Sequence, residues 1–130
     1  MESTKRMTDN FPTLGPIIVG TTNIVMLLPF YEKVFGLTVD NQGDNYLMGK
    51  LTDGTIMELE EHSEQRFPNW KEHNVGTYKN SEFKVKDIHL FLETVAAHGG
   101  KVISQAKQRP WGSWGAEIAD PEGNIFLITS

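Results

Sequence analysis

The chain has no cysteine, and this absence excludes several kinds of site. Without thiols there is no thiolate nucleophile, zinc–thiolate centre, iron–sulfur cluster or disulfide. Because proteins of reducing compartments carry few disulfides, we expect a cytoplasmic protein.

Basic residues and long apolar runs are also scarce. The 12 Lys and Arg residues are outnumbered by 17 Asp and Glu, which gives a net charge of −5. This charge repels phosphates and anionic lipids, so we expect neither nucleic acid nor membrane as a partner. The longest apolar stretch, residues 24–31, is interrupted by Pro29 and is far shorter than the roughly 20 residues of a membrane span. A cationic or neutral small molecule suits the charge better.

The 130 residues, of which 38% are hydrophobic, fit one globular domain with its own core. Residues 24–35 and 88–95 have the apolar spacing of amphipathic helices. Thr22 or Asn23 is placed to cap the first helix, and Asp87 is placed to cap the second.

Glycines are placed to end both helices. Gly36 follows the first helix, and either Gly99 or Gly100 follows the second. Pro29 lies inside the first pattern and removes one backbone hydrogen bond, so that helix is expected to bend or to start late.

Eight short segments have the composition of strands, at residues 16–20, 37–40, 46–51, 55–60, 82–85, 101–104, 116–119 and 125–128. The order strand, helix, three strands therefore occurs twice. Asn23 precedes Asp87 by the same 64 positions (87 − 23) that separate Gly36 from Gly100 (100 − 36). We predict an internally repeated α+β domain, with helices on one face of its sheets and a cleft on the other.

Two stretches of the sequence resemble motifs of a known family. They are FYEKVFGL at residues 30–37 and DPEGNIF at residues 120–126, with PWG at 110–112 as a weaker similarity. The chain resembles the vicinal oxygen chelate superfamily over residues 16–129; this superfamily includes glyoxalase I, extradiol dioxygenases and bleomycin resistance proteins.

The resemblance implies tandem βαβββ modules that form a curved mixed sheet around a cleft, commonly completed in a homodimer. The expected division is an N-terminal tail (residues 1–15) and a single glyoxalase-like domain (residues 16–130), with modules at about 16–61 and 77–130 joined by a linker at about 62–76.

Metal-dependent members carry one ligand, commonly His or Glu, on the first and on the last strand of each module. The resemblance puts these positions at about Pro16, Glu58, Ser81 or Glu82, and Leu127. Catalytic metals need about three protein ligands, and this set offers one carboxylate, or two if Glu82 faces inward. We predict no metal and no other cofactor, with a divalent metal as the alternative.

Glu58 is the first candidate site residue, for catalysis and for ligand binding. Strand alternation puts Ile56, Glu58 and Glu60 on one face and the apolar Met57 and Leu59 on the other. Glu58 would face the cleft and bind a cationic group, or act as a general base if desolvation raises its pKa. The alternative is a solvated or salt-bridged carboxylate.

Glu60 is a second candidate ligand-binding residue. Together with His62 it continues the two-residue spacing from Glu58, which would align two carboxylates and an imidazole. His62 lies past the expected strand end, so we expect a solvated acidic rim rather than a metal site.

Four aromatic residues, Trp111, Trp114, Phe67 and Trp70, complete the candidate ligand-binding set. If the face of Trp114 is the cleft, its indole would stack on a planar ligand or hold a cation; otherwise the tryptophans pack in the core or in a dimer. Phe67 and Trp70 either close over the cleft or anchor the linker to the core.

These observations favour a glyoxalase/bleomycin-resistance-like protein that binds a small cationic or aromatic molecule without a metal, as a homodimer. One alternative is a metal-dependent lyase, isomerase or dioxygenase that uses Glu58. The other is a non-catalytic protein-interaction module. The sequence does not decide whether the chain is an enzyme.

Overall fold

The computed structural model describes residues 7–73 and 82–130. The expected boundary between linker and second module, at residues 76 and 77, lies outside these ranges, as do Ser81 and the first six residues of the tail. In the described ranges, no helix has both the length and the apolar character needed to cross a membrane.

The first half of the chain forms one four-stranded sheet, sheet A. After a 3₁₀ turn (Met7–Asn10) come β1 (Ile17–Thr21), α1 (Ile24–Val34), β2 (Thr38–Gln42), β3 (Tyr46–Lys50) and β4 (Ile56–Glu61). The strand order is β1-β4-β3-β2, with β1 parallel to β4 and the other pairs antiparallel.

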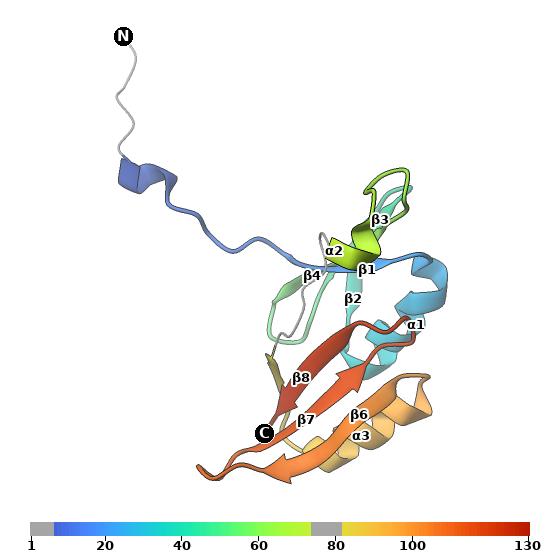
Figure 1. The fold of residues 1–130 in the computed structure, drawn as a ribbon. Helices are drawn as coiled ribbons and strands as arrows, with labels where there is room; N and C mark the ends of the chain where they lie inside the picture. Colours follow the sequence, from blue (N-terminus) through green and yellow to red (C-terminus); the bar gives the residue numbers. More distant parts are fainter. Residues whose placement is uncertain (1–6, 74–81) are drawn as a thin grey trace.

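The second half repeats this arrangement as sheet B. After a short helix, α2 (Trp70–His73), come β5 (Glu82–Lys84), α3 (Ile88–Ala97), β6 (Lys101–Gln108), β7 (Trp114–Ala119) and β8 (Ile125–Thr129). The order β5-β8-β7-β6, with β5 parallel to β8, matches that of sheet A (Figure 1). The predicted α+β fold of two βαβββ modules is confirmed, and its strands form two mixed sheets.

The predicted helix caps are present. The side chains of Asn23 and Asp87 each accept a hydrogen bond from a backbone amide three residues later, at 3.1 Å. Gly36 and Gly99 follow the helices with φ of 71° and 89°, a conformation that side chains with a Cβ disfavour. Pro29 is exposed, and α1 begins at Ile24, so the expectation of a late start is wrong.

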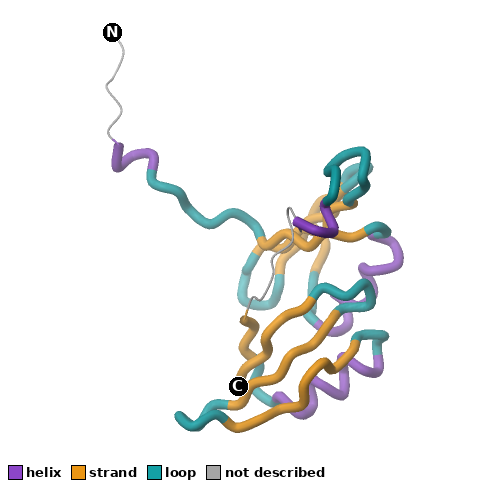
Figure 2. Tube along the Cα trace, in the orientation of Figure 1, coloured by secondary structure: helices purple, strands orange, loops and turns teal. Residues whose placement is uncertain are grey.

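The helices cover one face of the sheets, as Figure 2 shows for α3 along β6 and β7. Apolar side chains from both modules form one core in this layer. The half-buried Phe35 packs against this core, with ring centroids 5.0, 6.0 and 5.9 Å from those of Phe83, Phe91 and Phe126. The two modules therefore share a single hydrophobic core.

The two family-like motifs contact each other across the modules. The Tyr31 hydroxyl of α1 donates a 2.7 Å hydrogen bond to Asp120, which is 3% exposed in the turn between β7 and β8. Asn124 of the same turn donates to the Gly20 carbonyl at the end of β1. These motif residues hold the halves of the fold together.

Candidate functional site

Glu58 and Glu60 lie on the face of sheet A opposite to the one that α1 covers, called here the open face. Their strand neighbours Met57 and Leu59 are fully buried on the other side, as the alternation predicts. Glu58 is half-buried and faces Met48 of β3 across the ladder, and its partner on β1 is Ile18.

The environment of Glu58 favours its protonated form. Partial burial raises the pKa of the Glu58 carboxyl above its ordinary value, and a hydrogen bond to Glu60 and the charge of Glu60 raise it further. The charge of Arg66 acts in the opposite direction. Glu58 is therefore suited to hold a proton, or to give it up when a cation approaches.

His62 extends this pair, but not as expected. The residue is 3% exposed, and Nε2 lies 2.9 Å from Oε1 of Glu60. The residues after β4 fold back, so that the rings of Phe67 and Trp70 lie 4.7 and 5.1 Å from the imidazole. The predicted solvated rim is wrong for His62, because periodicity within a strand does not reveal contacts with the chain that follows it.

Phe67 and Trp70 serve this packing. Trp70 is 6% exposed, and both rings lie against His62, which corresponds to the linker-anchoring alternative. The structure brings these two aromatics against His62, which in turn contacts Glu60.

Trp114 lies on the face of sheet B that α3 covers, not on the face where the cleft was expected. Its ring is 5.3 Å from that of His89 on α3, and Ala116 and Ile118, which share its strand face, are buried in the core. The condition for ligand stacking by Trp114 is not met, and core packing explains it. Trp111 is 72% exposed in the turn between β6 and β7, next to the guanidinium of Arg109 at 5.5 Å.

The strand register shows which side chains lie beside the two carboxylates at the expected metal positions. Ile18, not Pro16, pairs with Glu58, and Glu82 pairs with Leu127. The Glu82 carboxylate accepts a 2.9 Å hydrogen bond from the Thr129 hydroxyl. The four positions therefore hold two carboxylates and two aliphatic side chains.

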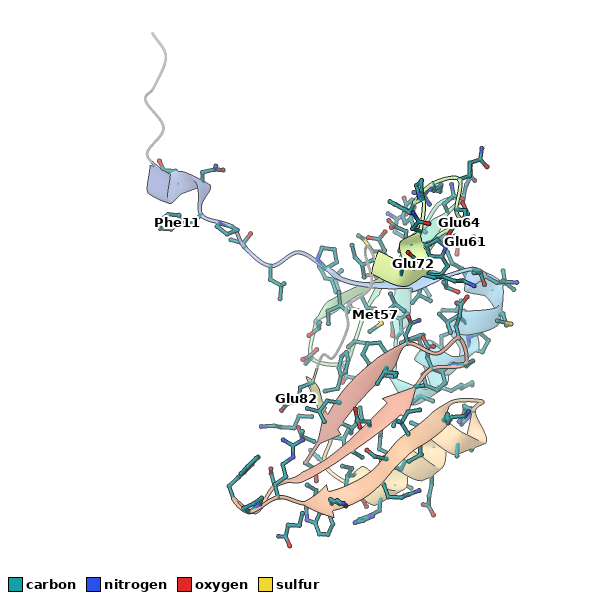
Figure 3. All side chains as sticks on the ribbon, viewed as in Figure 1. Phe11, Met57, Glu61, Glu64, Glu72 and Glu82 are labelled. Atoms are coloured by element: carbon teal, nitrogen blue, oxygen red, sulfur yellow. The ribbon has the colours of Figure 1, made fainter. Side chains whose placement is uncertain are left out.

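This donor set does not fit the metal of the metal-dependent members. Within residues 7–73 and 82–130, no three His, Asp or Glu side chains are grouped closely enough to hold a metal ion. Figure 3 shows Glu82 on β5, well apart from Glu61, Glu64 and Glu72 at the other end of the molecule.

The sequence did not reveal a hollow on the face of sheet B opposite to α3, called here the open face of sheet B. Its volume is about 640 Å³, and Arg109, Glu117 and Leu127 lie in its wall. The signal that was available is the glycine at position 115, which faces the guanidinium of Arg109 across the hairpin.

Solved structures share this fold. A glyoxalase/bleomycin resistance protein/dioxygenase family enzyme from Burkholderia phytofirmans PsJN superposes with a TM-score of 0.67 and 18% identity, covering 85% of this chain and 92% of that one. A glyoxalase-related enzyme from Fulvimarina pelagi gives 0.68 and 19%, covering 92% and 88%. The bleomycin resistance determinant encoded on transposon Tn5 gives 0.64 and 14%, covering 92% and 98%.

Sequence comparison agrees at the level of the family. No curated protein matches the chain. The family model of the Glyoxalase/Bleomycin resistance protein/Dioxygenase superfamily matches residues 13–128, nearly the whole chain. With the twofold βαβββ topology, this match shows that the chain belongs to the glyoxalase/bleomycin resistance protein/dioxygenase superfamily.

Proposed function

We propose that the protein binds a small cationic or aromatic molecule on the open faces of its sheets and does so without a metal. The observation that carries this proposal is the Glu58–Glu60 pair. One of its carboxyls has a raised pKa and lies between the aliphatic side chains of Ile18 and Met48. An ammonium or amidinium group placed there would neutralise the mutual repulsion of the two carboxylates.

Metal independence rests on chemistry at the four strand positions. Ile18 and Leu127 provide no donor atoms, so these positions offer only the carboxylates of Glu58 and Glu82, fewer than the three or so protein ligands that a catalytic metal needs. We therefore infer that the open faces bind their ligand by charge and shape.

We further propose that the binding form is a homodimer. Phe11 and Leu14 are 63% and 80% exposed in a segment that extends away from both sheets (Figure 3). A second copy would bury these side chains, which single domains rarely leave exposed together. Light scattering on the full chain tests this part, since a monomer at micromolar concentration would contradict it.

Thermal shift measurements test the binding function. Cationic glycopeptides and aromatic amines form the panel, with benzylammonium as the simplest cationic probe and benzyl alcohol as its neutral counterpart. A ligand that binds only the native state raises the Tm. Benzylammonium should stabilise the wild type but not Glu58→Gln. It should also stabilise the control Glu32→Gln, which makes the same charge change at an exposed position of α1. Equal stabilisation of all three proteins would contradict a role for Glu58.

Catalysis by Glu58 is the second candidate, and the raised pKa favours it. A carboxyl that titrates closer to neutrality exchanges protons with a bound substrate more effectively. If the reaction were metal-dependent, protein purified without chelators would contain a near-stoichiometric divalent metal, and Glu58→Gln would lose it. Elemental analysis of both proteins tests the metal-dependent form of this candidate.

A further inference from the structure

The open face of sheet B carries a hollow with more positive than negative side chains, whereas the open face of sheet A carries Glu58 and Glu60. Residues of β6, β7 and β8 and of the turn after β6 line about 640 Å³ of space. Lys107 and Arg109 bring two positive charges to its wall, and Glu117 brings one negative charge. Leu127, Pro110 and Ala116 make much of the rest apolar.

Arg109 is fixed at the edge of this hollow by its backbone and by a glycine. Its N–H donates to the Ser113 carbonyl at 2.7 Å, and its own carbonyl accepts from the Gly112 amide at 2.8 Å. The guanidinium lies over Gly115 on β7, so close that a Cβ there would be 2.5 Å from Nη2 and 2.7 Å from Nε. Only a residue without a side chain leaves room for this placement.

No carboxylate of the described residues pairs with this guanidinium. Its contact is with the ring of Trp111, 5.5 Å from Cζ, which supports the planar group and leaves its N–H donors free. Glu117, in the same hollow, accepts a hydrogen bond from the Ser104 hydroxyl instead. The fork of N–H donors on a guanidinium matches the two oxygens of a carboxylate or another oxyanion.

We propose that this hollow binds a small organic oxyanion with a planar apolar body, such as an aromatic acid. Arg109 would take the oxyanion in bidentate geometry, and the apolar body would lie against Leu127 and Pro110. Trp111 is a positioning residue that keeps the guanidinium flat over Gly115. The inference rests on the proposed small-molecule function and adds a charge preference for sheet B that is opposite to that of sheet A.

Titration of the ¹⁵N-labelled full chain with benzoate tests this inference, followed through the Arg109 Nε–H and the Gly115 amide. Phenyl phosphate and inorganic phosphate distinguish an aromatic acid from any phosphate, and benzamide is the neutral isostere. A hydrogen-bonded charged group contributes roughly tenfold or more in affinity, so benzoate should saturate at least about tenfold more tightly than benzamide.

Two variants separate geometry from charge. Arg109→Gln removes the guanidinium, and Gly115→Ala keeps it but displaces it; the fold tolerates the alanine because it meets only the flexible end of a side chain. Both should lose benzoate binding by about tenfold or more, whereas Lys101→Gln, an equal charge change at the far end of β6, should not.

The outcomes distinguish this inference from the proposed function. If benzoate binds Arg109→Gln and Gly115→Ala as tightly as the wild type, or if benzamide and inorganic phosphate bind as well as benzoate, the inference is wrong. Benzylammonium binding that depends on Glu58 would still support the proposed function. If benzoate binding depends on Arg109 while benzylammonium fails at Glu58, the sheet B site stands and the cation site does not.

Discussion

Removal of the Tyr31 hydroxyl is the sharpest test of how the two modules are joined. The Tyr31→Phe change keeps the ring, whose centroid is 5.3 Å from that of Phe30 and 5.0 Å from that of Phe35. It deletes only the 2.7 Å hydrogen bond to Oδ2 of Asp120. Any loss of stability therefore measures this one contact between α1 and the turn after β7.

The size of the loss follows from what Asp120 keeps. Oδ2 still accepts from the Asn124 side chain at 2.8 Å, and Oδ1 still accepts from the amides of Glu122 and Asn124 at 2.9 Å each. Hydrogen bonds to charged groups contribute about 1.5–3 kcal/mol, and the three remaining donors favour the lower end, about 1.5 kcal/mol. For a domain of this size the Tm should fall by roughly 6 °C.

Urea unfolding of the wild type, Tyr31→Phe and a Tyr46→Phe control measures this difference. Tyr46 is half-buried on β3, and its change should alter the free energy of unfolding by less than about 0.5 kcal/mol. Equal stability of Tyr31→Phe and the wild type would refute the reasoning, since it would mean that the other donors fully satisfy the buried carboxylate.

The wild type and Tyr31→Phe should also differ in how their stability depends on pH. Burial raises the pKa of Tyr31, and the charge of Asp120 and the hydrogen bond to it raise it further. A group whose pKa is raised by folding contributes stability that is complete below its unfolded pKa, about 10, and is lost as the pH rises above that value. The difference in free energy of unfolding between the wild type and Tyr31→Phe should therefore be constant from about pH 7 to about pH 9, below the unfolded pKa. It should shrink above about pH 10.

Three further predictions concern the rest of the chain. Asn23→Ala and Asp87→Ala should each lower the free energy of unfolding by about 1 kcal/mol, because each removes a helix cap. Asp87→Ser should keep most of the wild-type stability, since serine is also a good cap. No loss of stability in urea titration would mean that the caps are not needed. Gly49→Ala should cost more than about 1 kcal/mol because its Cβ would lie 2.3 Å from the Thr38 carbonyl, whereas Gly15→Ala, with open space around it, should be neutral. Folding raises the pKa of Glu58 above its ordinary value of 4.5, so ionisation of Glu58 opposes folding as the pH rises above that value. Glu58→Gln should therefore gain stability relative to the wild type as the pH rises towards neutrality. Parallel pH profiles of stability for the two proteins would contradict this.

The fold was predictable because local signals specify it. Cap residues at Asn23 and Asp87, glycines after both helices and the two-residue alternation of Met57 and Leu59 each act within a few positions of the chain. The twofold order of elements then leaves few ways to arrange eight strands. Pro29 does not delay the start of α1, which begins at Ile24 with the proline ring on its exposed side.

The site was less predictable because it depends on contacts between distant segments. The pairing of Glu58 with Ile18 is a register between strands some 40 residues apart, and no local pattern specifies it. Burial of His62 depends on the return of Phe67 and Trp70, and the hollow at Arg109 depends on Gly115. None of these pairings leaves a periodic signal in the sequence.

The motifs that reveal the family also explain why function is harder to infer than fold. Tyr31 and Phe35 of the first motif contact Asp120 and Phe126 of the second at the joint between modules, within the helix-covered layer. A change there destabilises the fold, whereas Glu58 and Arg109 lie on open faces, where substitutions change charge and shape at little cost in stability. Residues on these faces are therefore free to differ between proteins with the same joint, and ligand preference has to be determined from the open faces themselves.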